Sequence, residues 1–279
     1  MHVLSSIQEM RLWVKEKRRA QNTIGFVPTM GALHRGHLAL IELAHKHCDH
    51  TIVSIFVNPT QFGPNEDFNR YPRSTEQDLA LCKAHKVSAV FLPDARELYP
   101  ESNYIDFSIH TLNSFLCGPS RPGHFEGVLQ IVNKLFNIVD PDIAVFGQKD
   151  YQQYKIIEHL TLSTNQSVTL ILCPTVREED GLALSSRNAY LTEEERLRAP
   201  LIYTSLIELR DLIIKGNDFY QSIQIITSKL ELSGFRVDYL SIVSESDLQP
   251  VNYFKGTVVL AIATYLGKTR LIDNLLIES

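Results

Sequence analysis

Short apolar runs that alternate with longer amphipathic segments constrain the fold of this chain more than any other sequence feature. The apolar runs lie at 23–28, 50–58, 87–93, 142–147 and 167–174. Their lengths fit strands that are buried on both faces. Apolar residues recur at helical spacing in the segments 6–20, 36–48, 75–86, 125–139 and 149–160. Strands that alternate with helices in this way predict βαβ units and one parallel sheet covered on both faces.

The character of the sequence changes after Pro174. A polar loop at 176–191 leads to two helical segments, 192–215 and 218–232, and then to three strand-like runs, 235–243, 257–266 and 269–277. We therefore predict an α/β protein of two domains, a Rossmann-like domain at 1–174 and a smaller α+β domain at 175–279. Two helix starts carry a capping-box pattern, Ser6 with Glu9 and Thr192 with Glu195.

The composition excludes several classes of protein. The formal net charge is -5 and the Lys and Arg residues are scattered, whereas a nucleic-acid-binding protein usually carries a basic stripe or patch. No apolar run approaches the roughly 18 residues that a membrane span needs, and the charged N-terminus does not resemble a secretory signal. We expect a cytoplasmic protein that binds neither nucleic acid nor a membrane.

Cysteine and histidine spacing does not predict a metal site. Cys48, Cys82, Cys117 and Cys173 lie far apart in the sequence, which suits buried apolar residues in a reducing compartment. The cluster at 45–50 contains three histidines beside Cys48, but its spacing follows no zinc pattern. A solvated helix end is the better interpretation of that cluster.

The loop after the first buried strand is the first candidate for chemistry. It reads PTMGALHRGH over 28–37, with a helix expected to begin at Gly36 or His37. A helix N-terminus offers N–H groups and partial positive charge to a phosphate, and glycine lets the phosphate approach the backbone. The spacing of His34 and His37 predicts that both imidazoles lie on one side of the first turn. By itself the pattern is also compatible with turn histidines at a helix start.

Two further segments favour a nucleotide site. FGQKDYQQ at 146–153 follows a predicted strand and presents Lys149, which suits a phosphate, although a lone lysine is more often solvated. LSSRN at 184–188 places two hydroxyls beside Arg187, whose guanidinium can make paired hydrogen bonds to phosphate oxygens. The second segment is also compatible with a polar turn before the helix at Thr192. Three such loops in one α/β chain predict nucleotide chemistry.

The motifs together resemble a known family. An HxGH pattern after the first strand and a Ser/Arg-rich loop after the last resemble the nucleotidylyltransferase superfamily. The full set is similar to the pantothenate synthetase family, and it comprises PTMGALHRGH, VNPTQF, PGHFEGV, KLFN, FGQKDYQQ and LSSRNAYL. The resemblance implies an ATP-dependent, AMP-forming ligase of pantothenate and coenzyme A biosynthesis. Such an enzyme condenses pantoate with β-alanine through a pantoyl-adenylate and releases pyrophosphate.

The resemblance also implies roles for matching residues. His37 would donate a proton to the developing or departing phosphate, Gln61 and Gln153 would bind pantoate, and Gln61 would also lie near β-alanine. Asn58 would belong to the same loop with a less defined role. We predict His34, His37, Lys149 and Arg187 as the catalytic donors. The implied ATP-binding residues are Met30, Gly31, Ala32, Leu33, His34, Arg35, Gly36, His37, Gly147, Gln148, Lys149, Asp150, Val176, Leu184, Ser185, Ser186 and Arg187.

The resemblance implies partners as well. Mg²⁺ would accompany ATP, with no protein ligands assigned, the chain would form a homodimer, and the domain at 175–279 would act as a lid. Two positions depart from the expected pattern, with Gln130 in place of threonine and Gln148 in place of glutamate beside Lys149. Arg121 and His124 could lie either near the active site or at a subunit contact.

Three alternatives differ in the chemistry that they require. An adenylyltransferase would share HxGH and the closing loop but would transfer AMP to another small acceptor. A tRNA synthetase is disfavoured by the acidic charge and by the lack of length for an anticodon-binding domain. A nucleotide-sensing module without turnover would not need the full set His34, His37, Lys149 and Arg187.

Overall fold

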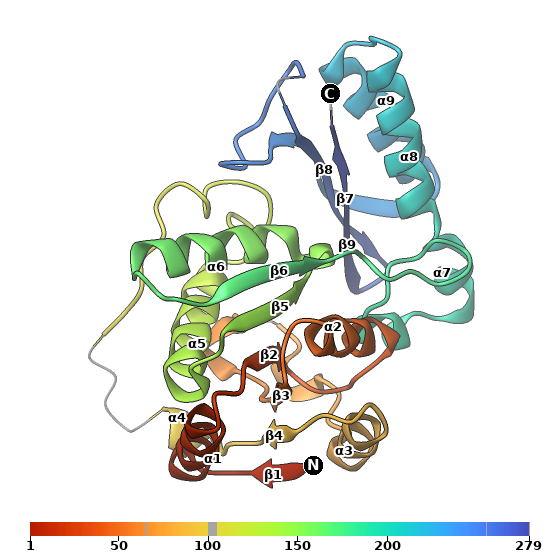
Figure 1. Cartoon of the computed structure of the whole chain (residues 1–279). Coiled ribbons are helices and arrows are strands. Elements are labelled where there is room, and N and C mark those ends of the chain that lie inside the picture. Colours follow the sequence, from red (N-terminus) through yellow and green to blue (C-terminus); the bar gives the residue numbers. More distant parts are fainter. Residues whose placement is uncertain (65, 100–104, 255, 279) are drawn as a thin grey trace. The chain divides into compact units, whose positions relative to one another are not determined.

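The computed structural model describes residues 1–64, 66–99, 105–254 and 256–278 (Figure 1). The chain divides into two compact units. Unit 1 comprises Met1–Ile109, Pro122–Gly147 and Gln153–Pro174, and unit 2 comprises His110–Arg121, Gln148–Gln152 and Thr175–Ser279. The last passage of the chain from unit 1 to unit 2 follows Pro174, where the domain boundary was predicted. The earlier segments His110–Arg121 and Gln148–Gln152 also belong to unit 2. The predicted division at 174/175 itself stays a prediction.

Unit 1 contains a parallel sheet of six strands in the order β1-β4-β3-β2-β5-β6. The strands are β1 (His2–Leu4), β2 (Ile24–Thr29), β3 (His50–Ile55), β4 (Ala89–Phe91), β5 (Ile143–Gly147) and β6 (Thr169–Cys173). From β2 the chain adds strands first on one side and then, from β5, on the other. The order of the strands therefore reverses between β2 and β5, which is the position where open parallel sheets bind ligands.

Helices cover both faces of this sheet, as predicted. They are α1 (Ile7–Arg19), α2 (Arg35–His45), α3 (Thr75–Ala84), α4 (Ala95–Leu98), α5 (His124–Val139) and α6 (Tyr151–Ser163). Figure 1 shows α2 and α3 on one face and α1 and α5 on the other. Single 3-10 turns lie at η1 (Pro59–Gln61), η2 (Phe68–Arg70), η3 (Gln148–Asp150) and η4 (Ser186–Tyr190). Among the described residues, no helix is long and apolar enough to span a bilayer.

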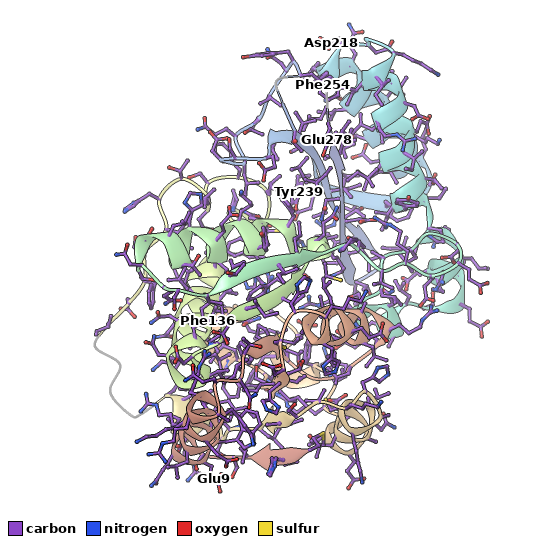
Figure 2. The ribbon with its side chains drawn as sticks, viewed as in Figure 1. Glu9, Phe136, Asp218, Tyr239, Phe254 and Glu278 are labelled. Atoms are coloured by element: carbon purple, nitrogen blue, oxygen red, sulfur yellow. The ribbon has the colours of Figure 1, made fainter. Side chains whose placement is uncertain are left out.

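Aromatic residues join α5 to the sheet. The Phe136 side chain is 5% exposed (Figure 2). Its ring lies edge-on to Phe26 of β2 and Phe146 of β5, with centroid distances of 6.3 Å and 6.4 Å. Edge-to-face pairs at this separation add to the free energy that burial already contributes. The packing fixes α5 against the two strands that flank the reversal of strand order.

Unit 2 consists of an antiparallel three-stranded sheet and helices. The strands β7 (Phe235–Ser244), β8 (Val258–Leu266) and β9 (Thr269–Ile277) pair in sequence order. The helices are α7 (Glu193–Arg198), α8 (Leu201–Ile214) and α9 (Phe219–Leu232), and α8 and α9 lie on one face of the sheet (Figure 1). Asp218 caps α9, and Phe219 packs edge-on against Phe254 with ring centroids 5.5 Å apart (Figure 2).

Most predicted elements are confirmed, one long helix is wrong, and the short elements β1 and α4 were not predicted. Both capping boxes form, at Ser6 and at Thr192. The predicted helix 192–215 is instead two helices, α7 and α8, because Pro200 lacks the N–H that a continuous helix would use there. The strand β1 was not predicted, since its three residues are too few for a periodic signal and it lies at the sheet edge.

Truncation of the central α5 aromatic residue tests this account of the unit 1 core. Phe136→Ala leaves a cavity against β2 and β5, so we expect the free energy of unfolding of unit 1 to fall by about 3–5 kcal/mol. Fluorescence of Trp13, the sole tryptophan of the chain, reports on unit 1 during urea titration. Leu162→Ala, at a position 67% exposed on α6, is the control. Equal losses in the two variants would contradict the account.

Candidate active site

The loops that carry the predicted residues of unit 1 leave one edge of the sheet. β3, β2 and β5 are adjacent and parallel, so their carboxyl ends lie side by side. The segment 30–37 follows β2, Gln61 follows β3, and Gly147 ends β5. The predicted residues are therefore collected at the reversal of strand order, where ligands of such sheets bind.

A buried carboxylate holds the loop after β2. Asp78 of α3 is 1% exposed, and its oxygens accept the N–H groups of Ala32 and Leu33 at 2.9 Å and 2.8 Å. Gly31 has φ of +81°, and a Cβ there would come within 2.9 Å of Asp78 Oδ2. Glycine is required at position 31 because the backbone is left-handed and the carboxylate lies against it. Contacts within the protein thus fix the backbone of this loop.

The two histidines of the HxGH pattern lie together at the start of α2. His34 is the N-cap, so the helix begins at Arg35, one residue before the predicted start. Gly36 N–H donates to His34 Nδ1 at 3.1 Å, and His34 N–H donates to His37 Nδ1 at 3.3 Å. The ring centroids are 4.1 Å apart, which confirms that the imidazoles share one side of the turn. Because each Nδ1 accepts a backbone N–H, a neutral ring carries its proton on Nε2.

The Gln61 side chain is held by a network of buried polar groups. Gln61 is 8% exposed; its Oε1 accepts from Asn58 Nδ2 at 3.1 Å, and its Nε2 donates to Met30 Sδ at 3.2 Å. Asn58 is held in turn by the Tyr99 hydroxyl, which donates to Asn58 Oδ1 at 2.6 Å. The structure therefore brings Met30 and Gln61 together, and it gives Asn58 the role of orienting Gln61.

The N-terminal turn of α5 supports the same residues. His124 Nδ1 donates to the Gln61 carbonyl at 2.8 Å, and Asn58 Nδ2 donates to the Gly127 carbonyl at 3.1 Å. A Cβ at Gly127 would lie 2.3 Å from the Thr60 carbonyl oxygen, so only glycine allows this approach. Of the two places left open for His124, the structure favours the one near the candidate site. These contacts explain why PGHFEGV occurs together with VNPTQF.

Unit 2 holds the second set of predicted residues. Lys149 Nζ lies 3.6 Å from Asp150 Oδ2, within a 3-10 turn whose backbone is bound by Asn274 of β9. Gln148, the departure from the family pattern, donates from Nε2 to Asn274 Oδ1 at 3.3 Å. A glutamate at this position could not make this bond, because an ionised carboxylate has no N–H or O–H to donate.

The loop after β6 forms a short hairpin in unit 2. Leu184 N–H donates to the Val176 carbonyl at 3.0 Å, and Glu178 N–H donates to the Leu182 carbonyl at 2.8 Å. Ser185 then caps the η4 turn by accepting Arg187 N–H on its hydroxyl at 3.2 Å. The hairpin thus presents Leu184 to Arg187 at the end of an ordered support.

The predicted residues therefore form two groups. Met30 to His37 and Gln61 lie in unit 1, and Gln153 lies there too, half-buried in the first turn of α6. Gln148 to Asp150, Val176 and the segment 184–187 lie in unit 2. That both groups bind the same ATP stays a prediction. Within the described part of the chain, no three His, Cys, Asp or Glu side chains are placed to hold a metal ion.

The supporting residues Asp78 and Tyr99 were not predicted from the sequence. Asp78 lies four residues before the buried Cys82 on α3, and a carboxylate on the apolar face of a helix is a signal that could have marked it. Tyr99 carries no such signal, since its contact with Asn58 depends on how the loops after β3 and β4 pack.

Fold and loop geometry define the class of protein: an α/β enzyme whose Rossmann-like sheet presents paired histidines at a helix N-terminus. The sequence matches the family described as Pantoate-beta-alanine ligase over residues 2–276. The chain belongs to this family.

Curated relatives agree with the family match. Pantothenate synthetase of Thermosipho africanus is 48% identical over 282 residues, covering 99% of this chain and 100% of the relative. Pantothenate synthetase of Fervidobacterium nodosum is also 48% identical and covers 100% of both chains.

Solved structures extend the agreement to the fold. Pantothenate synthetase of Thermus thermophilus has a TM-score of 0.93 at 40% identity, with 99% of each chain covered. Pantoate-beta-alanine ligase of Francisella tularensis has a TM-score of 0.84 at 37% identity, covering 99% of this chain and 97% of that one. The latter structure is described as complexed with beta-gamma ATP and beta-alanine. The predicted fold class and family are confirmed.

The Asp78 contacts generate a prediction for the loop after β2. Asp78→Asn keeps the size of the side chain, but its NH₂ group cannot accept a backbone N–H. We expect faster hydrogen exchange at the Ala32 and Leu33 amides and a loss of about 1–3 kcal/mol in the stability of unit 1. Glu76→Gln, an exposed change on the same helix, is the control. Unchanged exchange at both amides in Asp78→Asn would contradict the assignment.

Proposed function

We propose that this chain condenses pantoate with β-alanine at the expense of ATP, releasing AMP and pyrophosphate. The observation that carries the proposal is the pair His34 and His37 at the start of α2, in a member of the pantoate–β-alanine ligase family. The Francisella tularensis relative, whose structure is described as holding an ATP compound and beta-alanine, supports the same substrates. Met30 and Gln61 lie in contact within the same unit.

The first step makes the carboxylate reactive. A carboxylate is a poor acyl electrophile, because its leaving group would be oxide. One oxygen of the pantoate carboxylate attacks the α-phosphorus of ATP, the bond from that phosphorus to the bridging oxygen breaks, and pyrophosphate leaves. The product is a pantoyl-adenylate, in which AMP is a good leaving group.

Fixed hydrogen-bond donors stabilise the charge that develops in this step. Negative charge builds on the phosphoryl oxygens and on the departing pyrophosphate, and donors preorganised there are the largest catalytic contribution available. His34 and His37 supply Nε2–H groups from unit 1, and Lys149 and Arg187 supply charged donors from unit 2. His37 donates its Nε2 proton to the phosphate group in a hydrogen bond.

The second step forms the amide bond. The amine of β-alanine attacks the acyl carbon of the adenylate, the bond from that carbon to the AMP oxygen breaks, and the amine loses a proton. Gln61 and Gln153 bind pantoate and present its carboxylate, and Gln61 also lies near the amine. The contacts of Gln61 with Asn58 and Met30 support this role, since they fix the orientation of its amide group.

The family resemblance supports the proposed nucleotide-binding residues. They are Met30 to His37, Gly147 to Asp150, Val176 and the segment 184–187. Mg²⁺ enters with the triphosphate as part of the substrate, because magnesium is usually held through phosphates and few protein ligands. The chemistry that Mg²⁺ supplies is neutralisation of phosphate charge, and loss of turnover on chelation with EDTA tests it.

Assembly and location follow the family resemblance. We infer a homodimer, as the family resemblance implies, and a cytoplasmic location, as the absence of a signal or membrane segment in the sequence led us to expect. A solution mass of one chain, measured by sedimentation at micromolar concentration, would contradict the dimer.

Transfer of AMP to a different acceptor is the rival that shares most of the site. It is not favoured, because the family match spans residues 2–276 and its relatives are pantothenate synthetases.

Measurement of pyrophosphate release distinguishes the ligase from this adenylyltransferase. We expect a single-turnover burst with ATP, Mg²⁺ and pantoate, and steady turnover when β-alanine is added. ATP binding without pyrophosphate release in either condition would overturn the proposal.

Replacement of His37 tests the proton donor. His37→Ala removes one donor at the developing charge, so we expect kcat for pyrophosphate release to fall by about a hundredfold or more. His47→Ala changes an exposed histidine just beyond the other end of α2 and should keep wild-type turnover. Near-wild-type kcat in His37→Ala would remove His37 from the mechanism.

The second domain and the loop at 182–188 act as a lid that excludes water from the adenylate. Arg187 is a trypsin site within this loop, so bound ATP is expected to slow cleavage there. Arg96, whose side chain is 97% exposed, is the internal control whose cleavage should not change. Equal cleavage after Arg187 with and without ATP would contradict the lid.

A further inference from the structure

Two adjacent buried polar residues of β9 attach different segments of unit 2 to the sheet. Asp273 and Asn274 are each 3% exposed. Neighbouring residues of a strand point to opposite faces of the sheet. Asp273 shares its face with Leu271 and Leu275, which belong to or pack against the core that α8 and α9 cover. Asn274 points to the other face, where η3 lies against β9.

Asp273 fixes the base of the hairpin at 176–184. Its carboxylate makes a two-pronged ion pair with Arg177, with N···O distances of 2.5 Å and 2.9 Å. The Arg177 guanidinium also donates to the Gly181 carbonyl at 3.1 Å and lies over the ring of Tyr203 at 3.8 Å. Burial raises the pKa of Asp273, and the neighbouring Arg177 opposes that shift. Two-pronged pairing fixes orientation as well as distance.

Asn274 fixes the segment that carries Lys149. Its Nδ2 donates to the carbonyls of Gln148 and Lys149 at 2.8 Å and 3.0 Å, and its Oδ1 accepts from Gln148 Nε2 at 3.3 Å. Its backbone N–H donates to Asp273 Oδ1 at 2.8 Å, so the two sets of contacts are joined through the backbone of β9. Both carboxylate oxygens of Asp273 and both polar atoms of the Asn274 side chain have partners, and satisfied groups make a buried network rigid.

We propose that Asp273 and Asn274 are positioning residues that hold the Lys149 turn and the 184–187 loop in one fixed relation. The proposal rests on the proposed function, because it is ATP that would contact both segments. A bound triphosphate then meets Lys149 and Arg187 as one preorganised set, without the entropic cost of ordering two independent loops. The residues do not touch the substrate themselves.

Asn274→Ala is the sharper of two tests, since it removes both donors to the Lys149 turn without leaving a buried charge. We expect kcat for adenylate formation to fall by about tenfold to a hundredfold and KM for pantoate to change by less than about twofold. Hydrogen exchange at amides 149–151 should quicken while exchange in β8 stays unchanged. Thr264→Val is the matched control, because it removes a buried hydrogen bond from Thr264 Oγ1 to the Arg236 carbonyl in the same sheet.

Asp273→Asn tests the other side of the network and serves if Asn274→Ala does not fold. It replaces the ion pair with Arg177 by weaker hydrogen bonds, so we expect faster trypsin cleavage after Arg187. We also expect a lower kcat with little change in KM for pantoate. Wild-type kcat in a folded variant of either kind would overturn the proposal. The proposal would also be overturned if kcat fell in both Asn274→Ala and Thr264→Val in proportion to the stability that each variant loses.

The two proposals fail in different ways. If wild-type protein releases no pyrophosphate with pantoate, the proposed function fails. Hydrogen exchange at 149–151 and cleavage after Arg187 still measure whether Asn274 and Asp273 hold the two segments. Unchanged exchange and cleavage in both variants would overturn the positioning role whatever the wild-type enzyme catalyses.

Discussion

The parallel pairing of β2 with β3 on one side and with β5 on the other is the constraint on which unit 1 depends. It brings the carboxyl ends of three strands to one edge and makes the reversal of strand order coincide with the loop that carries His34 and His37. Gln61 reaches the same edge only because β3 is the neighbour of β2. A register or order other than this one would separate residues that belong to three distant parts of the sequence.

Buried polar groups of unit 1 hold the candidate site residues in fixed positions. A buried carboxylate, Asp78, holds the loop before α2, and Asn58 and His124 hold Gln61 from two sides. The contacts that hold these groups lie within the protein, so substrate binding need not order them. Fixed dipoles and donors stabilise a transition state more than mobile ones, because no reorganisation is needed as charge develops. Unit 2 applies the same principle through Asp273 and Asn274.

The sequence predicted the parts of this arrangement that are local. Periodicity located the buried strands and their helices, and the capping residues Ser6 and Thr192 marked helix starts within a residue or two. The spacing of His34 and His37 predicted that their rings lie on one side of the first turn, and the motifs predicted the family. Contacts between distant segments could not be predicted. Asp78 with Ala32, Tyr99 with Asn58 and Asp273 with Arg177 depend on packing across elements, and no short-range pattern encodes them. Pro200 lies at the break between α7 and α8, but the helical periodicity on both sides of it predicted one continuous helix.

The central claim is that the carboxylate of pantoate attacks the α-phosphorus of ATP, and oxygen isotopes test it most directly. Pantoate labelled with ¹⁸O in both carboxylate oxygens would be turned over with ATP and β-alanine, and the AMP and pantothenate analysed by mass spectrometry. The account predicts one ¹⁸O in AMP and one in the new amide, because the attacking oxygen stays with phosphorus when the amine takes the acyl carbon. Unlabelled AMP, with the label in pyrophosphate or phosphate, would contradict it.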